Sequence, residues 1–136
     1  HTATLSLKST LMKLRYARHT KDLSQIVSFY TEIVGLTISG SFQDHDGYSG
    51  VFLNTPKSAW ELEFTQSERK TDHKSDPDDA LVFYSKTLAE WVELKERLKN
   101  FGIDLASCPN PYWNEHGLSF LDPDGFSVII AKPKIS

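Results

Sequence analysis

The stretch FLDPDGFSVII, from Phe120 to Ile130, is the clearest structural signal in the second half of the chain. An apolar segment leads into the run Asp-Pro-Asp-Gly, and a second apolar segment follows it. Proline and glycine in such a run are typical of a tight turn between strands. The stretch therefore predicts two strands, at 117–122 and 127–132, joined by a turn.

The residues before this stretch predict a strand, a helix and one more strand. β-Branched and aromatic residues predict strands at 80–85 and 103–107. Between them, apolar residues recur at helical spacing over 87–102, and Gly102 ends the pattern. The second half of the chain therefore has the order strand, helix, strand, strand, strand, or βαβββ.

The first half has the same order. Alternation predicts a strand at 14–19, helical spacing predicts a helix over 21–36, and three short strands follow within 37–66. Asp22 is placed to cap the helix and Gly35 to end it. The pair Gly35 and Gly102 and the pair Pro56 and Pro123 are each separated by 67 residues, since 102 − 35 = 67 and 123 − 56 = 67. A duplicated module explains both offsets.

The chain divides into four segments. Residues 1–11 are predicted to be a flexible tail, 12–66 the first module, 67–79 a charged linker without large apolar residues, and 80–136 the second module. A βαβββ module covers one face of its sheet with its own helix and leaves the other face for a partner. Two modules that face each other would enclose a cleft of the kind that binds small molecules.

Composition narrows the possible partners. The chain has 136 residues, a formal net charge of −3 and a hydrophobic content of 39%, as expected of one globular domain. The small negative charge gives no support for nucleic acid or an anionic membrane as a partner. No apolar run has the length of a membrane span. Cys108 is the single cysteine, so no internal disulfide is possible, and a reducing cytoplasm is the expected location.

These features resemble the vicinal oxygen chelate superfamily, which includes glyoxalase I, extradiol dioxygenases and bleomycin-resistance and fosfomycin-resistance proteins. The resemblance spans residues 14–132 and is carried by DLSQIVSFYTEIVGL, WELEFT and FLDPDGFSVII. It implies an α+β fold of two tandem βαβββ modules, whose curved mixed sheets face each other around a cleft. It also implies a small-molecule ligand and a homodimer.

Active members of this superfamily hold a divalent metal ion with a His early in each module and a Glu in its last strand. Carried over by position, the chain offers Arg15 and Glu63 in the first module, and Ala80 (or the adjacent Asp79) and Ile129 in the second. A guanidinium stays protonated and has no lone pair for a metal ion. The expected cofactor is therefore none, and a single divalent metal ion is the alternative.

We expect Arg15 and Glu63 to form an ion pair on the cleft face of the first module. The alternative is that Arg15 lies outside the cleft and Glu63 is a solvated strand residue. His19 shares a strand face with Arg15, and Tyr48 follows a polar turn at the cleft rim. Further candidate ligand-binding residues are Tyr112, Trp113 and Ile129.

Three functions stay open on these residues. The first is a metal-independent small-molecule-binding protein, for example one that binds an antibiotic or a metabolite. The second is a glyoxalase-like or dioxygenase-like enzyme, with an unconventional metal site that includes His19 and Glu63 or with Glu63 as a general base. The third is a structural or regulatory interaction domain. No catalytic residue is assigned.

Overall fold

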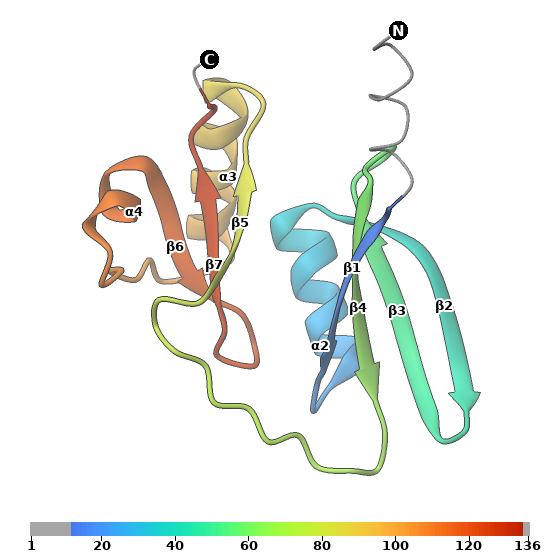
Figure 1. Cartoon of the computed structure of the whole chain (residues 1–136). Coiled ribbons are helices and arrows are strands. Elements are labelled where there is room, and N and C mark those ends of the chain that lie inside the picture. The colour runs from blue at the N-terminus through green and yellow to red at the C-terminus, as the bar shows by residue number, and fades with distance from the viewer. Residues whose placement is uncertain (1–11, 135–136) are drawn as a thin grey trace, which may run out of the picture.

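The computed structural model describes residues 12–134 and shows two modules side by side (Figure 1). The predicted tail at 1–11 lies outside the described residues. The first module contains β1 (Leu14–His19), α2 (Leu23–Ser28), the π-helix η2 (Phe29–Val34), β2 (Thr37–His45), β3 (Tyr48–Asn54) and β4 (Trp60–Gln66). Its four strands lie in the order β1-β4-β3-β2, with β1 parallel to β4 and the other pairs antiparallel.

The second module has a smaller sheet. It contains β5 (Ala80–Tyr84), α3 (Leu88–Asn100), the short helix α4 (Pro111–His116), β6 (Gly117–Leu121) and β7 (Ser127–Ala131). Its three strands lie in the order β5-β7-β6, with β5 parallel to β7. Residues 67–79 contain no helix or strand and connect β4 to β5. The α+β fold of two related modules is thus confirmed.

The strand predicted at 103–107 is wrong. The residues after Gly102 instead close the end of α3, where the Ile103 N–H donates to the Leu98 carbonyl oxygen at 2.9 Å. Gly102 makes this possible with a φ of +70°, in the left-handed region that glycine adopts readily. The backbone N–H of Ala106 reaches the Ser119 carbonyl oxygen at 2.7 Å beside β6.

Capping side chains explain where the helices begin. The Asp22 carboxylate accepts from the Gln25 N–H at 3.1 Å, as predicted, and Thr87 caps α3 in the same way. The predicted single helix at 21–36 differs in detail, since it continues as the π-helix η2 and ends at Gly35. No helix within residues 12–134 is long and apolar enough to cross a membrane.

One hydrophobic core joins the two modules through their helix-covered faces. The Phe29 and Phe120 rings, from different modules, lie 5.9 Å apart between centroids. Residues of both modules are buried together: Ile26, Phe29, Tyr30, Ile33, Leu36, Leu53, Leu62, Phe64, Leu94, Leu98, Leu118, Phe120, Val128 and Ile130. The opposite face of the four-stranded sheet is consequently left outside this core.

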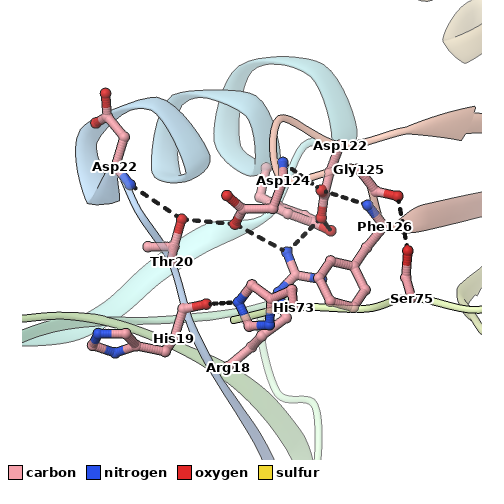
Figure 2. A network of polar contacts seen from close by, with 11 residues as sticks. Arg18, His19, Thr20, Asp22, His73, Ser75, Asp122, Asp124, Gly125 and Phe126 are labelled. Atoms are coloured by element: carbon pink, nitrogen blue, oxygen red, sulfur yellow. Dashed lines mark hydrogen bonds and ion pairs between the residues drawn. The ribbon is translucent and has the colours of Figure 1, made fainter. Parts of the chain in front are cut away.

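A buried ion pair also connects the modules, and the DPDG turn supplies its acidic partner (Figure 2). Arg18 of β1 places Nη2 2.5 Å from Asp122 Oδ2 and 3.8 Å from Asp124 Oδ2. Tyr30 donates its hydroxyl to Asp122 Oδ2 at 2.7 Å. The side chains of Arg18 and Asp122 are only 4% and 0% exposed. The motif that carries the family resemblance therefore has a structural role at the module interface.

The surroundings of this pair favour the charged guanidinium. Burial lowers the pKa of Arg18, but the interactions with Tyr30, Asp122 and Asp124 outweigh burial, and the net effect raises that pKa. Burial raises the pKa of Tyr30 well above its ordinary value, and the neighbouring Asp122 adds to this effect. Arg18 thus remains a cation and Tyr30 a neutral hydrogen-bond donor.

The connecting segment is fastened to the same region (Figure 2). The His73 ring donates to the backbone carbonyl of His19 and lies edge-on to Phe126, with ring centroids 4.9 Å apart. Ser75 donates its hydroxyl to the Gly125 carbonyl oxygen at 3.3 Å. These contacts hold the segment between β4 and β5 against both modules.

Candidate functional site

The candidate site is the face of the four-stranded sheet that points away from the core. Along β4, Leu62 and Phe64 enter the core, so Glu61, Glu63 and Thr65 share the opposite face. The parallel register places Arg15 of β1 beside Glu61 and Ala17 beside Glu63. Arg15, His19 and Glu63, all predicted as site residues, therefore lie on one sheet face.

Arg15 binds mainly to Glu61 and only weakly to the predicted partner Glu63. Its Nε and Nη2 atoms lie 2.8 and 2.5 Å from Glu61 Oε1, whereas Nη1 lies 3.9 Å from Glu63 Oε1. The predicted Arg15–Glu63 ion pair is therefore present, but Glu61 is the nearer partner because the register of the two strands puts it directly opposite Arg15. The hydrogen bond from Arg15, with help from Lys13, lowers the pKa of Glu61.

Two phenylalanine rings extend this face into an apolar surface. Phe42 of β2 covers Gly50, where a Cβ atom would come within 2.5 Å of the ring, and Phe52 of β3 covers Gly40 in the same manner. The two rings lie 5.8 Å apart, and the Arg15 guanidinium sits 4.4 Å above the centroid of Phe52. Neither ring was among the predicted site residues, although the glycine opposite each of them, Gly50 and Gly40, was a usable signal.

His19 lies at the end of the same face, next to Tyr48. Its ring nitrogens lie 2.8 Å from the Thr65 hydroxyl and 3.1 Å from the Ser67 hydroxyl. The rings of His19 and Tyr48 are 5.6 Å apart. Burial, together with the positive charge of Arg69, lowers the pKa of His19. His19 thus lies on the same sheet face as Arg15 and Glu63, and both of its ring nitrogens are hydrogen-bonded to hydroxyl groups.

The second module has a pocket of its own, separate from the open sheet face. A pocket of about 390 Å³ is lined by Ala80 and Ile129, together with Trp113 and Cys108 from the segment around α4. Cys108 donates its thiol to the Ser119 hydroxyl at 3.0 Å. The structure thus brings Trp113 and Ile129 together, but in a pocket whose lining does not include Arg15, His19 or Glu63. Tyr112 is exposed and stacks on His116, with ring centroids 4.4 Å apart, and does not line this pocket.

The residues present do not fit the metal centre that the superfamily implies. At the positions that the resemblance assigns to metal ligands, Arg15 is bound to Glu61, and the side chains of Ala80 and Ile129 have no donor atom. Asp79, the alternative to Ala80, is exposed. Within residues 12–134, no group of three or more His, Cys, Asp or Glu side chains is placed to hold a metal ion. Glu63 is the single matching ligand type at the four positions.

Two family models match the chain, one in each module. The YycE-like N-terminal domain matches residues 14–65, and the YycE-like C-terminal domain matches residues 78–132. The uncharacterized protein YycE of Bacillus subtilis (strain 168) is 37% identical over 90% of this chain and 88% of its own length. A crystal structure of a YycE protein of unknown function from Bacillus subtilis superposes with a TM-score of 0.82, at 36% identity and 91% coverage of both chains.

More distant structures share the fold alone. Glyoxalase I from Leishmania major superposes with a TM-score of 0.70 at 21% identity, over 89% of this chain and 86% of that one. TnmS3, an antibiotic binding protein from Streptomyces sp. CB03234, gives 0.66 at 16% identity, over 90% and 96%. The two-module architecture of the vicinal oxygen chelate superfamily is thereby shown for this chain.

Proposed function

The chain belongs to the YycE-like family, and from that premise we propose that the open face of its four-stranded sheet binds a small organic molecule without a resident metal ion. One observation carries the proposal: Arg15, at a position where the resemblance implies a metal ligand, is bound by Glu61 and Glu63. A guanidinium has no lone pair for a metal ion, and its N–H groups that Glu61 does not bind can donate to an oxygen of a ligand. The ligand site is a degenerate form of the superfamily's metal centre.

The chemistry of the face suggests what the ligand is like. The rings of Phe42 and Phe52 offer a flat apolar surface, and the half-exposed Arg15 guanidinium offers hydrogen-bond donors at its edge. His19 and Tyr48 add polar groups at the far end. A partly aromatic antibiotic or metabolite with an oxygen-rich group fits this arrangement, and no reacting group is required.

In this proposal a second copy of the chain completes the site. The proposed location of the protein is the cytoplasm. Within one chain the helix-covered faces pack together, so the open face has no facing wall from its own core. A homodimer would cover this open face and bring a second wall to the ligand.

Ligand binding is tested with a panel of antibiotics and aromatic metabolites in a thermal-shift assay, with chelator present throughout. We expect at least one compound to raise the melting temperature. Phe52→Leu should weaken its Kd roughly 2- to 13-fold, because a stacking contact of about 0.5–1.5 kcal/mol is lost. Phe101→Leu, at the exposed end of α3, is the matched control.

Other results of this screen would contradict the proposal. Equal effects of the two phenylalanine variants would remove the ligand from the open face. Turnover of a compound that stops with Glu63→Gln would instead favour the enzyme alternative with Glu63 as general base. Sedimentation equilibrium of the same samples gives the mass that the homodimer requires.

A further inference from the structure

A larger cavity lies between the two modules, on the side of β1 and β4 opposite to the candidate site. It has a volume of about 760 Å³. Its walls include Tyr16 and Trp60 from the first module and Phe83, Leu94 and Ile130 from the second. This volume is within the usual range for small-molecule sites, and the walls are mainly apolar and aromatic.

A buried hydroxyl group in this cavity has no partner. Ser85 follows β5, and strand alternation puts it on the same side as Leu81 and Phe83. It is 5% exposed and lines the cavity, yet within residues 12–134 its Oγ atom finds no hydrogen-bond partner. Buried hydroxyl groups without a partner are uncommon because they lose their bonds to water. A ligand that bonds to Ser85 would account for this group.

The charges around the cavity indicate a neutral ligand. Lys86 and Glu90 both line it and carry opposite charges, so neither an anion nor a cation is favoured. The Glu61 carboxylate is bound by Arg15 on the other sheet face and is not available. We propose that this cavity is a second binding site, for a neutral and mainly apolar molecule with one hydrogen-bonding group that pairs with Ser85. This site does not depend on the function proposed for the open sheet face.

Two probes that differ by one hydroxyl group test this proposal. We titrate the ¹⁵N-labelled full-length chain with 1-naphthol and with naphthalene and follow amide and indole resonances by NMR. We expect both probes to shift resonances of Trp60, Phe83 and Ser85, with 1-naphthol binding more tightly. Ser85→Ala should weaken 1-naphthol roughly 2- to 13-fold, as expected for one hydrogen bond, and leave naphthalene unchanged. Ser127→Ala, on β7 and outside the cavity walls, is the control.

Several outcomes would overturn the proposal. The first is that neither probe shifts resonances around Trp60, and the second is that the shifts are confined to the open face at Tyr48 and Phe52. The third is that 1-naphthol binds the wild-type chain and Ser85→Ala with equal affinity. Because Ser85→Ala removes a polar atom that is unpaired, it should fold at least as stably as the wild type. The circular dichroism spectrum of the variant therefore shows whether binding is lost because the chain misfolds or because the hydrogen bond is missing.

Discussion

Arg18→Ala is expected to lower the free energy of unfolding by about 3–5 kcal/mol, because it leaves the carboxylate of Asp122 buried without its cation. Arg18 and Asp122 have side chains that are 4% and 0% exposed and approach to 2.5 Å. Asp122 would keep the Tyr30 hydroxyl and two backbone N–H groups as partners. These neutral donors do not replace a positive charge in a buried position.

Urea unfolding followed by circular dichroism measures this loss. Arg15→Ala is the matched control, since it also removes an arginine of β1 that is paired with a carboxylate. The Arg15 side chain is 49% exposed, and Glu61, although only 6% exposed, keeps the cation of Lys13 and the Ser39 hydroxyl as partners, so a smaller loss is expected. If Arg18→Ala cost less than about 1 kcal/mol, the Arg18–Asp122 pair would not be the buried connection described above.

Phe120→Ala is expected to cost about 3–5 kcal/mol and to destabilise both modules together. Phe120 is 1% exposed and belongs to the second module, and its ring packs against Phe29 of the first. Because the modules share one core, the cavity left by this ring weakens the whole chain. Leu121→Ala is the control, since its side chain is 53% exposed on the same strand.

The same urea experiment decides between one core and two. We expect a single transition for Phe120→Ala when near-ultraviolet and far-ultraviolet signals are compared, with a lower midpoint than the wild type. Two separate transitions, with only one shifted, would mean that each module is stable on its own. That result would contradict a core shared through the helix-covered faces.

Local patterns were sufficient for most of the fold. The helix that begins after Asp22 and ends at Gly35 was predictable, because capping and helical spacing act over a few residues. Alternation also put Arg15 and His19 on one face of β1. The prediction of a strand after Gly102 was wrong because a short apolar segment can either end a helix or form a strand. The spacing of its apolar residues does not distinguish these two structures.

Contacts between distant residues were beyond such patterns. The partner of Arg18 is 104 positions away, in a turn that the sequence presents only as a turn. The partner of Arg15 depended on the register of β1 against β4, and a shift of two residues exchanges Glu63 for Glu61. The aromatic surface formed by Phe42 and Phe52 required the pairing of β2 with β3. Each of these features depends on how strands pair in three dimensions.

Metal analysis by inductively coupled plasma mass spectrometry tests whether the open sheet face holds a metal ion. The purified chain is analysed as isolated and after incubation with nickel, zinc, manganese or iron followed by desalting. With Arg15 bound to Glu61 and with Ala80 and Ile129 at two ligand positions, we predict far less than one metal ion per chain in every sample. About one tightly bound ion per chain would contradict a metal-independent binding face.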